Sequence, residues 1–121
     1  DGGQVTEGRS IALLLKKMAL DTYVFDACSS ACTTIFIGGA RRYLGKSGKL
    51  GFHQYGLIQG YQTSYYKPEE EQKIDEEFFQ SQQISQDFID EVFQAKHTEI
   101  WFPSPDRLIA AGAVHEIVEG P

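Results

Sequence analysis

A run of small and nucleophilic residues at a predicted strand–helix junction is the part of this sequence best suited to chemistry. It reads Cys28-Ser29-Ser30-Ala31-Cys32. The β-branched and aromatic run from Thr22 to Phe25 predicts a buried strand before it, and the apolar run from Ser30 to Phe36 predicts a helix after it. A serine at such a junction lies beside unpaired backbone N–H groups at the positive end of a helix dipole, which favour an oxyanion. Helix capping and cysteines that fill the core are the simpler explanation of the same residues.

The two cysteines, Cys28 and Cys32, are separated by three residues. A zinc site would need about two further ligands of suitable spacing, and none lies nearby in the sequence. The thioredoxin-type motif has two intervening residues rather than three. A disulfide across Ser30 and a pair of reduced thiols both remain open. The sequence thus predicts neither a metal nor an organic cofactor.

Size and composition predict one small globular domain over residues 1–121. Hydrophobic residues make up 41% and charged residues 23% of the chain, which excludes a disordered protein. No apolar run approaches the roughly 20 residues of a membrane helix. The net charge of −6 divides into +3 over residues 1–60 and −9 over residues 61–121, so a nucleic-acid surface is not expected on the acidic half. Arg41 and Arg42 are interpreted as solvated surface residues.

The elements before and after the serine run must position it. Gly2-Gly3 predicts a tight turn, and a domain that begins on such a turn indicates that preceding strands are missing. Residues 6–18 predict an amphipathic helix, with an apolar stripe at Ile11, Leu14, Leu15 and Met18. Two short strands are expected over residues 41–44 and 50–53, around a turn at residues 45–48.

The second half of the chain is predicted to be mainly helical. Residues 69–97 form the longest helical pattern, interrupted around residues 80–86, and we interpret them as a helical arm that packs either on its own domain or on another subunit. Residues 56–68 are expected to be a surface loop that binds a partner. Ser104-Pro105 starts a helix that Gly112 ends, and residues 114–118 form the last strand. This order predicts an α/β fold.

Five motifs in this order resemble the ClpP/crotonase superfamily, in particular the Clp protease proteolytic subunit and a group of bacterial ClpP-like proteins predicted to be periplasmic. The resemblance covers nearly the whole chain and implies a spiral of ββα units that lacks its N-terminal strands here. The motifs are Gly2-Gly3-Gln4-Val5-Thr6-Glu7-Gly8, Ser29-Ser30-Ala31, Gly38-Gly39, Leu50-Gly51-Phe52-His53-Gln54, and Phe102-Pro103-Ser104 with Ala111-Gly112-Ala113-Val114.

The resemblance implies a role for each matching residue. Ser30 would be the nucleophile and His53, which follows it by 23 positions, the general base. The backbone N–H groups of Gly3 and Ala31 would form the oxyanion hole. Ser29 is the competing nucleophile, but the spacing to the glycine at the helix end favours Ser30. A buried, hydrogen-bonded histidine that ends a strand is the alternative interpretation of His53.

The third member of a catalytic triad is where the sequence departs from the family. Alignment of the motif that begins at Phe102-Pro103-Ser104 places Ile100 where the Clp subunit has an aspartate. Glu99 is one residue away and would serve after a loop shift, whereas Asp106 suits helix capping better. The site is therefore a triad with Glu99, a Ser-His dyad or an inactive site, and loss of the acid can cost about 10⁴ in rate.

The resemblance predicts a serine hydrolase that cleaves peptide bonds, acts on a peptide or protein substrate and assembles into a homo-oligomer. A non-catalytic partner-binding scaffold is one alternative. A crotonase-type acyl-CoA enzyme is another, which the pairing of Ser30 with His53 disfavours. The similarity to the ClpP-like proteins implies a periplasmic or otherwise exported protein in a bacterium, with a cytoplasmic one as the alternative.

Overall fold

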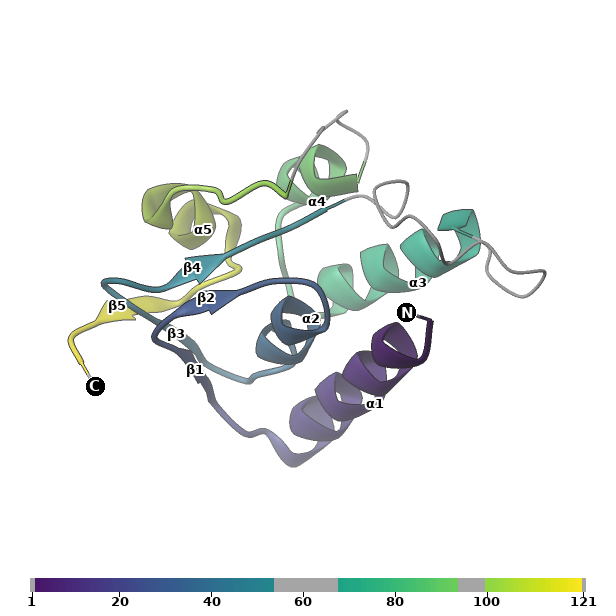
Figure 1. Cartoon of the computed structure of the whole chain (residues 1–121), viewed down its shortest axis with the longest axis horizontal. Helices are drawn as coiled ribbons and strands as arrows, with labels where there is room; N and C mark the ends of the chain where they lie inside the picture. Colours follow the sequence, from purple (N-terminus) through teal and green to yellow (C-terminus); the bar gives the residue numbers. More distant parts are fainter. Residues whose placement is uncertain (1, 54–67, 94–99, 121) are drawn as a thin grey trace.

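The computed structural model describes residues 2–53, 68–93 and 100–120, and side chains from residue 7 onward except that of Pro68. Two short strands follow each of the first two helices, and three helices precede the last strand (Figure 1). The elements are α1 (Gly2–Met18), β1 (Thr22–Val24), β2 (Ala27–Cys28), α2 (Ala31–Ile37), β3 (Arg42–Gly45), β4 (Lys49–Leu50), α3 (Pro68–Ser81), α4 (Gln86–Phe93), α5 (Pro105–Ala111) and β5 (Glu116–Val118).

The strands form two parallel sheets that the chain visits in turn. One sheet has the order β1-β3-β5, with Tyr23, Tyr43 and Glu116 in register, and the other pairs β2 with β4. The strands β1 and β2 are followed by α2, and the strands β3 and β4 are followed by α3. In each unit the first strand joins the larger sheet and the second strand joins the smaller one. This is the predicted ββα repeat. The two strands expected on either side of residues 45–48 are β3 and β4. They do not pair with each other: β3 pairs with β5 in one sheet, and β4 pairs with β2 in the other.

Helix α1 begins earlier than predicted and buries a different face. Gly2 and Gly3 lie in its first turn instead of forming a separate tight turn. The side of α1 that meets α2 carries small residues: a Cβ on Gly8 would lie 3.2 Å from Ala31, and a Cβ on Gly38 would lie 2.6 Å from the carbonyl oxygen of Ala12. Such close backbone approach leaves no room for large side chains.

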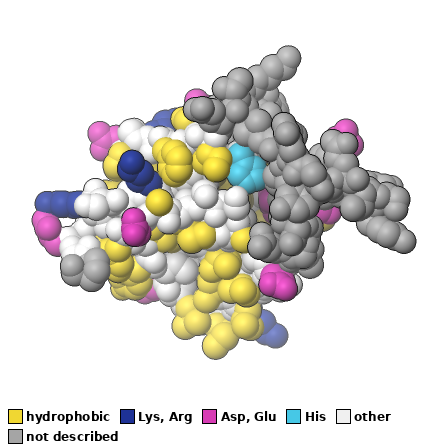
Figure 2. Space-filling model, viewed as in Figure 1, with side chains coloured by type: hydrophobic (Ala, Val, Ile, Leu, Met, Phe, Trp, Pro, Cys, Tyr) yellow, Lys and Arg dark blue, Asp and Glu magenta, His cyan; other side chains and the backbone are white. Residues whose placement is uncertain are grey.

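The apolar stripe predicted for this helix is consequently largely exposed. Ile11, Leu14 and Met18 are 44%, 54% and 57% exposed, while Ala12 is fully buried. Hydrophobic side chains gather over α1 at the bottom of the view in Figure 2. The 3.6-residue period correctly predicted the helix, but it could not tell which face meets the rest of the domain.

The predicted arm over residues 69–97 is two helices, α3 and α4, and both pack on their own domain. The break falls at residues 82–85, where Gln83 has a positive φ of 65° and Ile84 enters the core at 4% exposure. The phenylalanines of both helices join that core rather than facing outward: Phe78, Phe79, Phe88 and Phe93 are all buried. Residues 94–97 of the predicted arm lie outside the described residues.

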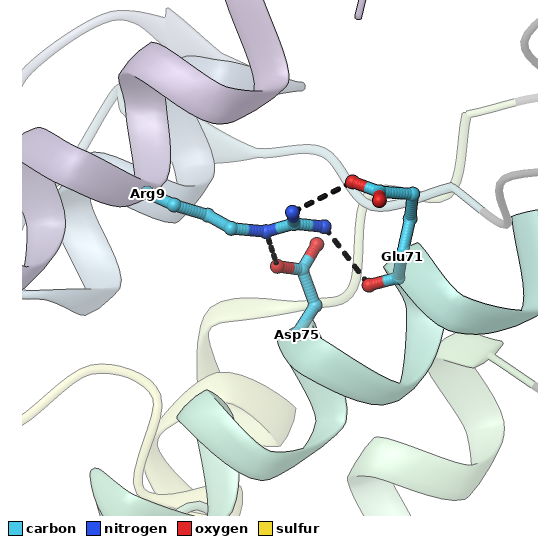
Figure 3. Close-up of polar contacts among 3 residues, drawn as sticks. All are labelled: Arg9, Glu71 and Asp75. Carbon is cyan, nitrogen blue, oxygen red and sulfur yellow. Dashed lines mark hydrogen bonds and ion pairs between the residues drawn. The ribbon is translucent and has the colours of Figure 1, made fainter. Parts of the chain in front are cut away.

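An ion-pair cluster joins α1 to α3 (Figure 3). Arg9 reaches Glu71 at 2.6 Å and Asp75 at 2.8 Å, and its guanidinium also donates to the carbonyl oxygen of Glu71. The side chains of Arg9 and Asp75 are only 13% and 6% exposed, so water screens their attraction poorly. This cluster fixes the first helix against the domain.

Replacing Arg9 with methionine is expected to lower the free energy of unfolding by about 3 kcal/mol, because the buried carboxylate of Asp75 loses its guanidinium partner. The matched control is Lys46→Met, since Lys46 pairs with Glu119 where both side chains are exposed; its cost should stay below about 1 kcal/mol. Urea unfolding measures both. Equal losses in the two variants would contradict the role assigned to the cluster.

Arg42 was predicted to be solvated, but it is one of the most buried residues, at 2% exposure. Its guanidinium donates to five carbonyl oxygens at the C-terminal ends of α2, α3 and α5; these belong to Ile37, Gly39, Gln82, Gly112 and Ala113. Burial lowers the pKa of Arg42 to about 10, which leaves it charged at neutral pH. The negative ends of three helix dipoles thus converge on one cation.

The neighbouring His115 makes stability depend on pH. Its Nδ1 accepts a hydrogen bond from the backbone N–H of Arg42 at 2.9 Å, which only an unprotonated nitrogen can do. Burial, and then the charges of Arg42 and Arg41, lower the pKa of His115, while Asp21 acts in the opposite direction. Neutral His115 therefore stabilises the folded protein at pH values above its pKa in the unfolded chain, about 6.5. This contribution is lost as the pH falls through the lower pKa that His115 has in the folded protein.

We therefore expect the difference in unfolding free energy between wild type and His115→Asn to shrink as pH falls from about 7 to about 5, because asparagine does not titrate. Denaturant titrations at several pH values measure this difference. A difference that stays constant over that range would contradict the assignment.

Candidate active site

Ser30 lies in a strained turn between β2 and α2. The N–H of Cys32 donates to the carbonyl oxygen of Ser29 at 3.1 Å, and Ser30 has φ 57° and ψ −127°. These angles match the first central position of a type II′ turn, which normally holds glycine. A non-glycine residue there costs about 1–3 kcal/mol and is typical of functional sites. The turn presents Ser30 at the surface.

His53 lies within hydrogen-bond distance of Ser30. The Ser30 Oγ is 3.2 Å from the His53 Nε2, across 23 positions of sequence. This is the long end of the hydrogen-bond range, and bonds of this kind between a nucleophile and its base are often long without substrate. The structure thus brings together the two residues predicted to be nucleophile and base.

The position of His53 follows from the residue before it. Phe52 forms an isolated antiparallel bridge with Trp101, in which both N–H···O bonds are 2.8 Å. The ring of Phe52 is buried and meets the ring of Phe88 edge-on, with centroids 5.3 Å apart. Because the backbone and ring of Phe52 are fixed, the backbone of the next residue, His53, is also held in a defined position. Sequence reasoning did not identify Phe52 or Trp101 as supports of the site.

Thr33 joins the helix that carries the nucleophile turn to both strands of the smaller sheet. Its Oγ1 lies 3.1 Å from the carbonyl oxygen of Cys28 and 2.8 Å from that of Gly51, and the side chain is buried. Cys28 ends β2 just before the turn, and Gly51 follows β4 two residues before His53. Thr33 therefore fixes the position of β2, which leads to Ser30, relative to β4, which leads to His53. A hydroxyl within an apolar run was the signal that could have identified it.

Replacing Thr33 with valine is expected to lower the free energy of unfolding by about 1–2 kcal/mol, since the buried hydroxyl bonds to the carbonyl oxygens of Gly51 and Cys28 are lost and only that of Cys28 keeps its backbone donor, the N–H of Gly51. The same change should lower the reactivity of Ser30 at temperatures where the variant is folded. Thr34→Val, at the next position of α2, is the matched control because Thr34 is only partly buried. Equal effects of the two substitutions on stability and reactivity would contradict the positioning role.

The two backbone groups proposed for an oxyanion hole lie at helix starts. Ala31 is the first residue of α2, and among the described residues none accepts a hydrogen bond from its N–H. Gly3 lies in the first turn of α1, where N–H groups have no intrahelical acceptor. The contact between Gly8 and Ala31 shows that the two helices meet close to the nucleophile turn.

The acidic third member cannot be placed, because Glu99 lies outside the described residues. Ile100, which the family alignment puts at the position of the acid, is 42% exposed. Asp106 lies exposed in the first turn of α5, where the Ser104 Oγ caps the helix by accepting from the N–H of Arg107 at 3.2 Å. This location agrees with the capping interpretation of Asp106.

Cys28 and Cys32 form a disulfide with a Cα–Cα distance of 5.4 Å, and sequence reasoning had left open whether they pair. Cys28 is buried at the end of β2 and Cys32 is exposed in the first turn of α2. Ser30 is the central residue of the loop that they close. Within the described ranges, no group of three or more histidine, cysteine or acidic side chains could hold a metal ion.

Solved structures resemble this chain, although no protein-family model and no curated protein matches it. ClpP1 from Listeria monocytogenes matches with a TM-score of 0.70 at 17% identity, over 97% of this chain and 68% of that one. Enoyl-CoA hydratase from Mycobacterium smegmatis matches with a TM-score of 0.61 at 12% identity, over 94% of this chain and 39% of that one. At these identities the likeness concerns the fold. The predicted α/β fold is confirmed, and the predicted resemblance to the ClpP/crotonase superfamily is confirmed at the level of the fold.

Proposed function

We propose that this protein is a serine hydrolase that cleaves peptide bonds, with Ser30 as nucleophile and His53 as general base. The observation that carries the proposal is the 3.2 Å approach of Ser30 Oγ to His53 Nε2 at a strained, exposed strand–helix turn. A nucleophile beside a base is the geometric signature of covalent catalysis. The match to a ClpP fold also supports the proposal.

In the proposed reaction the Ser30 Oγ attacks the carbonyl carbon of the scissile peptide bond while His53 Nε2 takes the hydroxyl proton. The carbonyl oxygen becomes an oxyanion and accepts hydrogen bonds from the N–H groups of Ala31 and Gly3. His53 then gives the proton to the leaving amine, and an acyl-enzyme remains. Water, activated by the same histidine, releases the acid and restores Ser30. Glu99 is the proposed orienting acid, and a dyad without it is the alternative.

Reaction of the folded protein with a fluorophosphonate, followed by mass mapping of the modified peptide, tests this proposal. We expect the label on Ser30 in wild type and in Ser29→Ala, and no label in Ser30→Ala. Ser29 is the matched control because it is the adjacent serine of the same turn. A label on Ser29, or no label on a folded protein, would contradict the assignment.

A crotonase-type acyl-CoA enzyme is the second candidate, and the match to an enoyl-CoA hydratase is the observation in its favour. Saturable binding of a CoA thioester that protects Ser30 from labelling would support it. A non-catalytic scaffold is less well supported, because Ser30 is exposed and within reach of His53. The residue 56–68 loop that this scaffold would use lies outside the described residues.

We further propose a homo-oligomer and an exported, periplasmic location in a bacterium, with a cytoplasmic one as the alternative. The exposed apolar side chains of α1 support the first proposal, and light scattering at high protein concentration tests it. The Cys28–Cys32 disulfide supports an oxidising compartment, and cell fractionation tests that. Within the described ranges, no helix is long and apolar enough to cross a membrane.

A further inference from the structure

The turn that carries Ser30 is bracketed by a covalent bond that the proposed reaction does not use. We propose that the Cys28–Cys32 disulfide is a positioning element: it holds Ser30 in its positive-φ conformation, so that opening the disulfide with a dithiol reductant lowers the reactivity of Ser30. This inference rests on the proposed function for its first test. A second test, on stability, is independent of activity.

The conformation of Ser30 needs an external constraint. With φ 57° and ψ −127°, the residue occupies a region that L-residues other than glycine disfavour, and a chain relaxes from such a region unless its surroundings prevent it. The backbone bonds that span the turn are Cys32 N–H to Ser29 O at 3.1 Å and Thr34 N–H to Ser30 O at 3.3 Å. Both are local bonds near or beyond the ordinary length, so they constrain the turn weakly.

The disulfide supplies a constraint from both sides of the turn. Cys28 is anchored in the sheet: its carbonyl oxygen accepts from the Gly51 N–H at 2.7 Å, and the residue is 3% exposed. Cys32 lies in the first turn of α2, which Thr33 ties to the same strands. The bond therefore fixes the distance between the last strand residue and the helix start, with Ser30 midway between them.

The disulfide is also open to chemistry from solvent, because Cys32 is exposed. A thiolate of a dithiol reductant attacks one sulfur, the S–S bond breaks and a mixed disulfide forms. The second thiol of the reductant then displaces the protein sulfur. Two electrons and two protons pass to Cys28 and Cys32, which become thiols, while the dithiol becomes a cyclic disulfide. The two ends of the turn are then held only by hydrogen bonds, those of the Thr33 hydroxyl and of the Cys32 N–H, and the turn is less constrained.

The first test measures fluorophosphonate labelling of the full chain in its oxidised, dithiothreitol-reduced and reoxidised states, well below the unfolding temperature of each. We expect reduction to lower the second-order rate constant by about 10- to 100-fold, as small misplacements of reacting groups do, and reoxidation to restore it. The double variant Cys28→Ala/Cys32→Ala should label at the reduced rate with or without dithiothreitol. With a cleavable peptide, kcat should fall while KM changes little.

The second test compares the melting temperatures of Ser30→Gly and Ser30→Ala in both redox states. Glycine adopts the turn conformation without penalty whereas alanine does not, so the glycine variant should melt several degrees higher in the oxidised protein. If the disulfide imposes the conformation, this advantage should shrink on reduction, because the alanine turn can then relax. A disulfide that merely stabilises the fold would lower both melting temperatures equally.

The outcomes separate the two proposals. Labelling that falls on reduction, together with a shrinking advantage of glycine, supports the positioning role. Equal labelling of folded oxidised and reduced protein overturns it. Absence of labelling in every state counts against the proposed function instead. The melting temperatures of Ser30→Gly and Ser30→Ala then decide the positioning role alone. It is overturned if reduction leaves the difference between these two melting temperatures unchanged.

Discussion

Ser30→Ala is expected to reduce hydrolysis of a peptide or ester substrate by at least about 10⁴-fold, because the alanine side chain has no atom that can attack the carbonyl. His53→Ala should cause a loss of similar size, since the serine hydroxyl loses the group 3.2 Å away that would take its proton. Initial rates measured on a fluorogenic substrate, at equal concentrations of folded protein, give both numbers.

The double variant sharpens this prediction. Residues that act as one catalytic unit lose activity non-additively, so Ser30→Ala/His53→Ala should be no slower than the worse single variant. Ser29→Ala should retain activity within a few-fold and controls for disturbance of the turn. Losses that multiply in the double variant would show that the two residues act independently, and full activity in Ser30→Ala would exclude it as nucleophile.

Arg42→Met is expected to lower the free energy of unfolding by about 4 kcal/mol or more, a loss that can prevent a domain of this size from folding. Methionine removes the guanidinium donor from five carbonyl oxygens. Those of Ile37 and Gly39 still accept from the side-chain amide of Gln82, so the cost falls mainly on the other three, at about 1–3 kcal/mol for each buried group left unsatisfied. The substitution also removes the cation at which the C-terminal ends of three helices meet.

The adjacent residue offers the matched control for Arg42. Arg41 is also an arginine, but its side chain is 56% exposed and lies over the ring of Tyr43. Arg41→Met should change stability by no more than about 1 kcal/mol. Urea unfolding, or soluble yield where Arg42→Met does not fold, measures the contrast. Similar stability of the two variants would contradict the role given to the buried guanidinium.

Local signals in the sequence predicted those parts of the fold that neighbouring residues decide. Ser104, Pro105 and Gly112 predicted α5, and the structure shows the serine cap, the proline in the first turn and a left-handed glycine with φ 81° at the end. The helix after Ser30 and the strand that begins at Thr22 were also predicted, whereas the two-residue strand β2, which directly precedes the turn, was not. Caps and turns depend on backbone groups only a few residues apart, so short-range rules apply to them.

The sequence also placed Ser30 and His53 at the ends of predicted elements, but by itself it could not bring them together. Their approach depends on the pairing of β2 with β4 and on the Phe52–Trp101 bridge, which join segments distant along the chain. The same limit left the Cys28–Cys32 pairing open. Whether two thiols four positions apart meet depends on the turn between them, and that turn is set by the sheet on one side and the helix on the other.

Burial is what only the tertiary structure decided. The sequence determined that residues 6–18 are helical and that two arginines stand together at positions 41 and 42. It did not determine that α1 packs through Gly8 and Ala12 and leaves Ile11 exposed, or that Arg42 is enclosed while Arg41 is not. Periodicity and composition describe one segment at a time, whereas burial depends on the shape and the polar groups of the segments that it meets.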